Sequence, residues 1–301
     1  MTRAGALFCL ASAAAFGAMG VVGKLAYAEG ATIGTLLATR FVLAAALFWL
    51  FLVCAGRVGD LRVLDRRDLG IAIALGAVGY GAQAGCAFAA LDRLDASLFS
   101  LLLYTFPVFV TVAAIALGRE PASRRTALAL VLASTGLVLV LAGAAAGALD
   151  PIGTALALGA AVIYSAYILS SEGVAARVGP LVLSTLLCTG AATTLTLASL
   201  AGGDLDPRSV SAAGFAWLVG LAVVSTVGAI ALFFAGLRRV GPMAASILST
   251  LEPVVTVALA FVVFGESLGP AQLAGGALVL GAVLAVRSPA TRHVKLGKKI
   301  A

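Results

Sequence analysis

Residues 237–266 read LRRVGPMAASILSTLEPVVTVALAFVVFGE, and residues 91–120 read LDRLDASLFSLLLYTFPVFVTVAAIALGRE. The two segments align when one is shifted by 146 positions. The matched pairs are Leu91 and Leu237, Arg93 and Arg239, Ser100 and Ser246, Leu102 and Leu248, Pro107 and Pro253, Val108 and Val254, and Glu120 and Glu266. Self-similarity of this kind marks a duplicated structural unit. Because the unit is about twenty apolar residues between short polar turns, it indicates a membrane protein built from two repeats.

The composition supports a helical membrane protein. Hydrophobic residues make up 62% of the chain and charged residues 11%, whereas soluble domains carry about 25% charged residues. Mean hydropathy is +1.13, and the apolar runs lack the period-two alternation of a transmembrane barrel. The net charge of +7 is explained by basic membrane loops, so we expect a lipid bilayer and no nucleic acid as partner.

The chain divides into ten predicted membrane spans. They cover residues 5–27, 32–55, 68–90, 96–117, 124–143, 151–171, 180–200, 213–235, 243–263 and 270–287. If both termini are cytoplasmic, sixteen of the twenty basic residues fall on the cytoplasmic side and only Arg93 and Arg208 on the other, while Lys24 and Arg40 lie within spans. This asymmetry supports the span count and the orientation.

A repeat of five spans begins and ends on opposite sides of the membrane, so the second copy must be inverted. The predicted fold is therefore an all-α integral membrane protein, with ten transmembrane helices in two inverted five-helix repeats. The first repeat covers residues 1–147, the second 148–287, and a basic cytoplasmic tail 288–301. Inverted repeats allow alternating access to a site near the midplane. One chain already holds both halves, so a monomer suffices.

Three groups of residues carry a family resemblance. They are Phe16-Gly17 followed by Lys24, Arg40-Phe41 followed by alanines at 44–46, and the Pro107…Glu120 and Pro253…Glu266 units. In this order the chain resembles the drug/metabolite transporter superfamily, in its ten-helix EamA-type branch, and is most similar to bacterial amino-acid and metabolite exporters. The resemblance implies a central cavity lined by the first, third and fourth helices of each half.

Glu252 is the most informative candidate site residue. A carboxylate inside an apolar span is costly and usually faces a cavity or a partner. It suits recognition of a substrate amine, proton coupling or gating, or else a structural bond to carbonyls freed by Pro253. Aromatic, thioether and amide side chains in the predicted cavity helices suit a mostly apolar site with a few polar groups. The predicted substrate-binding residues are Phe16, Met19, Tyr80, Gln83, Tyr104, Tyr164, Tyr167 and Glu252.

A second group of candidates concerns movement and electrostatics. Glycines at 17, 20 and 23 share one helix face and permit close backbone approach. Equivalent prolines in the two halves permit kinks that could serve as hinges. The predicted gating or hinge residues are Gly17, Gly20, Gly23, Pro107 and Pro253. Lys24 is explained by snorkelling to the interface and Arg40 by a helix-to-helix brace, although either could attract a substrate carboxylate. For Glu120 and Glu266 we expect capping or loop-ordering roles.

The sequence argues against enzymatic and ATP-driven classes. The four cysteines stand alone in apolar runs and the single histidine is His293, so neither a metal site nor a Cys/His pair is expected. No phosphate-binding glycine loop occurs, and no cofactor is expected.

The predicted function is an inner-membrane secondary transporter that exports amino acids or related small metabolites. The alternatives are a multidrug or lipophilic-cation carrier, a nucleotide-sugar carrier and, from another class, a membrane-embedded enzyme or a scaffold. A nucleotide sugar would require several buried basic residues, and only Lys24 and Arg40 qualify.

Overall fold

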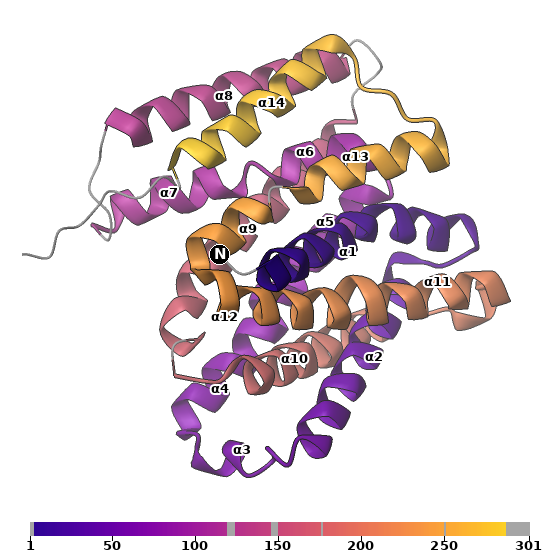
Figure 1. Cartoon of the computed structure of the whole chain (residues 1–301). Coiled ribbons are helices and arrows are strands. Elements are labelled where there is room, and N and C mark those ends of the chain that lie inside the picture. The colour runs from indigo at the N-terminus through magenta and orange to yellow at the C-terminus, as the bar shows by residue number, and fades with distance from the viewer. Residues whose placement is uncertain (1–2, 119–123, 146–149, 176, 250, 287–301) are drawn as a thin grey trace, which may run out of the picture.

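The computed structural model describes residues 3–118, 124–145, 150–175, 177–249 and 251–286, and every regular element in these ranges is helical (Figure 1). The elements up to residue 145 are α1 (Arg3–Ala28), α2 (Ile33–Cys54), α3 (Asp60–Val63), α4 (Arg66–Ala74), η1 (Leu75–Tyr80), α5 (Gly81–Leu91), α6 (Ala96–Leu103), α7 (Phe106–Ala116) and α8 (Arg124–Ala145). Those after it are α9 (Pro151–Ala175), α10 (Pro180–Ala201), η2 (Pro207–Ser209), α11 (Ala212–Ala222), η3 (Val223–Gly228), α12 (Ala229–Leu248), α13 (Leu251–Phe264) and α14 (Pro270–Val286).

Among the described residues, six helical stretches are long and apolar enough to span a membrane. They are Arg3–Ala28, Ile33–Cys54, Arg66–Leu91, Pro151–Ser171, Pro180–Ala201 and Ala212–Gly236. Four shorter apolar helices coincide with the remaining predicted spans, at Ala96–Val110, Val131–Val140, Leu251–Phe264 and Pro270–Ala282. The prediction of an all-helical membrane protein is therefore confirmed.

Two helix boundaries differ from the prediction. The predicted fourth span is interrupted at Tyr104-Thr105, so that α7 begins anew and Pro107 lies in its first turn. Proline is favoured there because its missing N–H would have no partner in any case. In the second half, α12 continues through residues 237–242, where the sequence predicts a loop, and ends at Leu248. Pro253 likewise lies in the first turn of α13.

The packing of helices is reciprocal between the two halves. α1, the first helix of the first half, packs against α11, α12 and α13, whereas α9, the first helix of the second half, packs against α5, α6 and α7. The second helices, α2 and α10, pack against each other. The last helices, α8 and α14, also form a pair and lie side by side along one edge of the molecule (Figure 1).

Glycines bring the paired helices into backbone contact. A Cβ atom on Gly136 of α8 would lie 2.6 Å from the carbonyl oxygen of Gly275 on α14, and one on Gly275 would meet the Gly136 carbonyl in the same way. Gly190 of α10 approaches η1, since its Cβ would lie 2.8 Å from the Ala77 nitrogen. Without a hydrophobic drive from water, such close packing is what holds membrane helices together.

The third helix of each half contains a π-helical segment. η1 interrupts the stretch between α4 and α5, and η3 interrupts the stretch between α11 and α12. Shifting Tyr80 by the repeat offset of 146 gives Thr226, so each repeat partner lies within a π-helical segment. π-helical turns are rare in proteins, and they occur often at functional sites.

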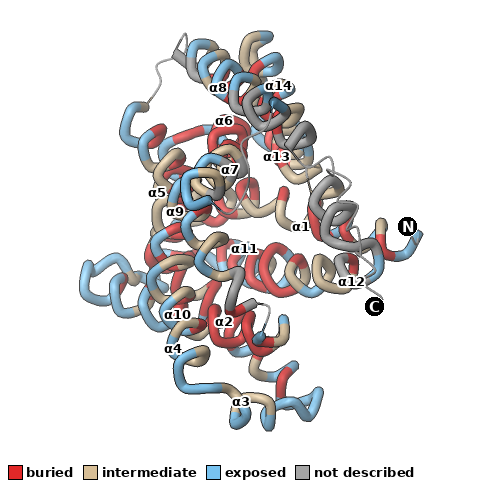
Figure 2. Tube along the Cα trace, turned by 90° about the vertical axis from the view of Figure 1, so that its left-hand side faces the viewer, coloured by how far each residue is buried: buried red, intermediate tan, exposed pale blue. Residues whose placement is uncertain are grey.

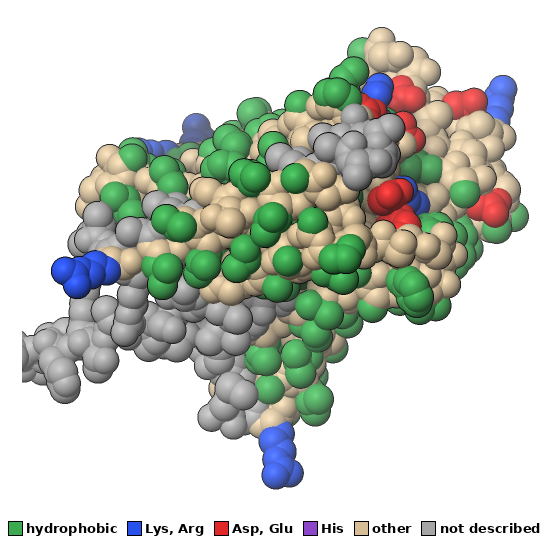
Figure 3. Space-filling model, turned by 90° about the horizontal axis from the view of Figure 1, so that it is seen from above, with side chains coloured by type: hydrophobic (Ala, Val, Ile, Leu, Met, Phe, Trp, Pro, Cys, Tyr) green, Lys and Arg blue, Asp and Glu red, His purple; other side chains and the backbone are tan. Residues whose placement is uncertain are grey.

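Burial and charge fit a protein with an apolar exterior. Buried residues line the facing sides of the helices, and exposed residues lie on the outer sides (Figure 2). The outer residues include large apolar side chains such as Val131, Phe261 and Val262, which are 62%, 61% and 77% exposed. Figure 3 shows the molecule from above: apolar side chains are spread over this face, and the charged side chains lie mainly near its edges. This distribution suits contact with lipid tails between two polar surfaces.

Candidate functional site

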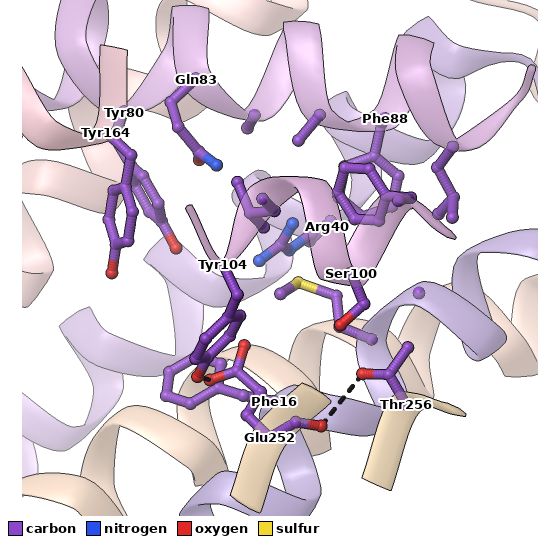
Figure 4. Close-up of a pocket in the computed structure, with 17 residues that line it drawn as sticks. Phe16, Arg40, Tyr80, Gln83, Phe88, Ser100, Tyr104, Tyr164, Glu252 and Thr256 are labelled. Atoms are coloured by element: carbon purple, nitrogen blue, oxygen red, sulfur yellow. Dashed lines mark hydrogen bonds between the residues drawn. The ribbon is translucent and has the colours of Figure 1, made fainter. Parts of the chain in front are cut away.

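A cavity of about 120 Å³ lies among helices of both halves. Seven elements line it: α1, α2, η1, α5 and α6 from the first half, and α9 and α13 from the second (Figure 4). The lining residues are Phe16, Met19, Gly20, Arg40, Tyr80, Gln83, Ala84, Ala87, Phe88, Leu91, Phe99, Ser100, Leu103, Tyr104, Tyr164, Glu252 and Thr256.

Glu252 brings a carboxylate to this cavity from the first turn of α13. The Tyr104 hydroxyl lies 3.0 Å from a Glu252 carboxylate oxygen and 2.9 Å from the Ser249 carbonyl, and it donates to this pair of acceptors. Figure 4 shows the Tyr104 ring beside the Glu252 side chain. Tyr104 is the first residue of the break between α6 and α7, and its phenol meets the carboxylate there.

Arg40 brings a guanidinium to the same cavity from α2 and is 2% exposed. Its Nε donates to the Thr226 hydroxyl at 2.9 Å. The guanidinium carbon lies 4.8 Å from the ring centre of Phe41 and 5.2 Å from that of Phe88. Within the described ranges no ion pair includes Arg40. Among its described lining residues, the cavity therefore has one cation and one carboxylate, and these do not pair with each other.

Aromatic rings form a continuous chain beside the cavity, and three of them, Tyr80, Tyr164 and Tyr104, line it. The consecutive ring centres, from Phe41 through Tyr80, Tyr167, Tyr164 and Phe106 to Tyr104, are 5.3, 5.8, 6.1, 4.7 and 5.7 Å apart. Offset and edge-on aromatic pairs at these distances are attractive. Tyr167 is absent from the cavity lining and stacks on Tyr80 and Tyr164 instead, so it supports two lining rings.

The three glycines of α1 lie against helices that border the cavity. Gly20 lines the cavity itself. A Cβ on Gly17 would lie 2.6 Å from the Glu252 carbonyl oxygen, and the Gly17 carbonyl accepts a 2.8 Å hydrogen bond from Thr256. A Cβ on Gly23 would lie 2.8 Å from the Phe88 ring. These contacts tie α1 closely to α13 and α5.

Lys24 and Glu266 connect the two halves at one end of the cavity helices. Lys24 Nζ lies 3.6 Å from Glu266 Oε1 and 3.9 Å from Asp95 Oδ1. The Glu266 carboxylate accepts hydrogen bonds from the backbone N–H groups of Ala96 and Ser97, both at 3.0 Å, and from the Ser97 hydroxyl at 2.9 Å. Glu266 thus caps α6, as the capping interpretation expects. Its repeat partner Glu120 lies outside the described residues.

Most predicted substrate-binding residues meet in one place. Phe16, Met19, Gln83 and the other predicted lining residues except Tyr167 border the cavity, and so does Arg40. Reasoning from sequence missed Phe88, Phe99 and Thr256 as lining residues. Thr256 lies one turn after Glu252 on the same face of α13, and this spacing could have identified it. Nothing in the sequence distinguishes Phe88 or Phe99 from core residues.

Comparison with known proteins identifies the family of this chain. The model of the EamA-like transporter family matches residues 3–142 and again residues 151–288. The chain belongs to the EamA-like transporter family. It is therefore a membrane transporter and not an enzyme.

Individual relatives of this transporter agree with the family match. It is 27% identical over 303 residues to the uncharacterised transporter YcbK of Bacillus subtilis, covering 98% of this chain and 96% of that one. It is 31% identical over 214 residues to the threonine/homoserine exporter RhtA of Escherichia coli, covering 67% and 69%. A solved crystal structure matches with a TM-score of 0.66 at 20% identity, covering 95% of this chain and 97% of the other, and this likeness concerns the fold.

Proposed function

We propose that this transporter exports amino acids or closely related small zwitterions across the cell inner membrane by alternating access. The observation that carries the proposal is a pair of opposite charges, the buried Arg40 and the partly buried Glu252, which line one cavity without pairing with each other. A free amino acid carries one carboxylate and one ammonium group. It offers each of these charges an opposite partner, which relieves the cost of leaving that charge uncompensated.

The size of the cavity supports a small solute. Its volume is about 120 Å³. Pockets for drug-sized ligands measure roughly 300–1,000 Å³, so a lipophilic drug or a nucleotide sugar fits this site poorly. The named exporter of threonine and homoserine among the relatives points to the same class of solute.

The reciprocal packing of the halves supports alternating access. In a two-fold arrangement, a contact from the first half to the second is matched by the inverse contact. The packing of α1 on the second half and of α9 on the first has this form, and the pairs α2–α10 and α8–α14 join corresponding helices. We therefore propose two inverted five-helix repeats, ten spans in all, with both termini cytoplasmic. Rocking of one half against the other would expose the cavity to each side in turn.

The test is flux through the purified protein in liposomes. Uptake of labelled threonine, with several unlabelled amino acids as competitors, is measured with and without an imposed pH gradient. We expect saturable uptake that several small amino acids inhibit. Acceleration by the gradient would identify proton coupling, with Glu252 as the first candidate, whereas an unaltered rate would identify facilitated diffusion.

Control liposomes without protein set the background. Transport of a lipophilic cation or a nucleotide sugar, with no flux of any amino acid, would overturn the substrate assignment while the family assignment stands.

A further inference from the structure

The two π-helical segments converge on Arg40. Thr226 of η3 accepts the hydrogen bond from Arg40 Nε. Tyr80 of η1 interacts electrostatically with the same guanidinium. Tyr80 and Thr226 occupy equivalent positions in the two repeats, at the offset of 146. The same guanidinium therefore interacts with the equivalent residue of each half. Both partners belong to the third helix of their half, and Arg40 lies on α2.

The π-helical geometry fixes the direction of the Thr226 hydroxyl. In an α-helix a threonine hydroxyl usually bonds a carbonyl three or four residues earlier. Thr226 instead donates to the carbonyl of Leu221, five residues earlier, at 3.0 Å. With its proton committed to Leu221, the hydroxyl has only lone pairs left for Arg40. Thr226 is fully buried and therefore shielded from bulk solvent.

These contacts orient the remaining edge of the guanidinium. Nε is held by Thr226, and the rings of Phe41 and Phe88 restrict the plane of the group. Figure 4 shows the group reaching into the cavity that Glu252 enters from α13. A guanidinium presents its donors as a planar fork that matches a carboxylate in two places.

We propose that Arg40 is the receptor for the carboxylate of the substrate and that Thr226 is the positioning residue that aims it. This inference rests on the proposed function and deepens it, because it assigns the two ends of a zwitterion. The carboxylate binds Arg40, and the ammonium group faces Glu252. On this account η3 matters because it directs the Thr226 proton to the carbonyl five residues earlier, at Leu221, and leaves a lone pair of the hydroxyl facing Arg40.

The experiment compares three labelled solutes of one carbon skeleton in liposomes. Threonine carries both charged groups, threoninol carries the ammonium group without the carboxylate, and 3-hydroxybutanoate carries the carboxylate without the ammonium group. The variants are Thr226→Val, which removes the hydroxyl, and Thr226→Ser, which keeps it. For Thr226→Val we expect about a tenfold higher KM for threonine, an unchanged KM for threoninol, and a maximal rate that changes little. Thr226→Ser should behave like the unmodified protein.

Ser225 provides the matched control. It neighbours Thr226 in η3, is 1% exposed, and its hydroxyl has no hydrogen-bond partner among the described residues. Ser225→Ala therefore removes an equally buried hydroxyl that does not touch Arg40, and the preference for threonine over threoninol should persist. If Thr226→Val only reduced thermal stability or maximal rate, with the same effect on both solutes, Thr226 would be a structural brace and the inference would be wrong.

The outcomes separate this inference from the proposed function. If threonine is transported and its KM is the same in Thr226→Val as in the unmodified protein, the inference is wrong and amino-acid export stands. If 3-hydroxybutanoate alone is carried, with a KM that depends on Thr226, the inference holds and the amino-acid assignment falls. If only threoninol is carried, both are wrong.

Discussion

Replacing Glu266 by alanine should destabilise the protein without touching the cavity. The Glu266 side chain is 10% exposed, and its carboxylate accepts three hydrogen bonds at the start of α6, from Ala96 N, Ser97 N and Ser97 Oγ. It also pairs with Lys24 of α1. Glu266→Ala removes all four contacts and leaves the first N–H groups of α6 without this acceptor.

The magnitude follows from these contacts. Loss of a helix cap costs about 0.5–2 kcal/mol, and a hydrogen bond to a charged acceptor contributes about 1.5–3 kcal/mol. Return of the carboxylate to water and partial rehydration of the helix end offset part of this sum. We expect Glu266→Ala to lower the free energy of unfolding by about 2–4 kcal/mol, and Glu266→Gln, which keeps one acceptor oxygen, to lower it by about half as much.

Unfolding by sodium dodecyl sulfate in mixed micelles, followed by circular dichroism, measures this quantity. Asp95→Asn is the control, since Asp95 neighbours the same Lys24 but its side chain is 71% exposed. An exposed ion pair contributes under about 1 kcal/mol. Equal effects of Glu266→Ala and Asp95→Asn, or a loss below about 0.5 kcal/mol for Glu266→Ala, would refute the capping account.

Three further predictions concern other regions. Glu252→Gln should lower threonine flux at least about tenfold at matched protein level, because about 1.4 kcal/mol of lost binding or coupling suffices; unchanged flux would remove Glu252 from the mechanism. Gly275→Ala places a Cβ against the Gly136 carbonyl and should cost about 1–3 kcal/mol of stability, seen as a lower melting temperature, while flux per folded molecule stays the same. The N–H of Gly153 holds the pKa of the Asp150 carboxyl below its usual 3.8, so the stability contribution of Asp150 is present above pH 4 and lost as the pH falls below it. The difference in melting temperature between Asp150→Ala and the unmodified protein should therefore narrow in acid, and a constant difference across the pH range would contradict this assignment.

The helical membrane fold could be predicted from the apolar runs, because spanning a bilayer demands about twenty apolar residues in a row. Helix interruptions were harder to predict. The residues of η1 are as apolar as those of a regular helix, and the interruption at Tyr104 precedes Pro107 by three residues. Such departures depend on which neighbouring groups satisfy the freed backbone, and that is decided by tertiary packing.

The candidate site shows the same division. Glu252 could be recognised because a carboxylate in an apolar span is energetically costly and usually has a function. Tyr164 and Tyr167 are both aromatic residues of α9. Only the packing shows that Tyr164 lines the cavity and that Tyr167 stacks on it from behind. Thr226 could not be selected from sequence at all, since its role depends on a π-helical turn and on Arg40, 186 positions away.

The chemistry of the cavity is less symmetric than its framework. Two pairs of repeat partners at the offset of 146 have one member in the cavity lining, Tyr80 with Thr226 and Glu252 with Phe106. In each pair the first half supplies an aromatic ring, and the second half supplies a polar group without one. A carboxylate in place of Phe106 would lie beside Tyr104, the hydrogen-bond donor to Glu252, and would add a like charge near a site where two carboxylates cannot both ionise readily. Phe106 instead packs between Tyr104 and Tyr164 and holds the ring that donates to Glu252. A proposed two-fold framework that rocks between two states can thus carry a site with one cationic and one anionic end, as a solute with two different ends requires.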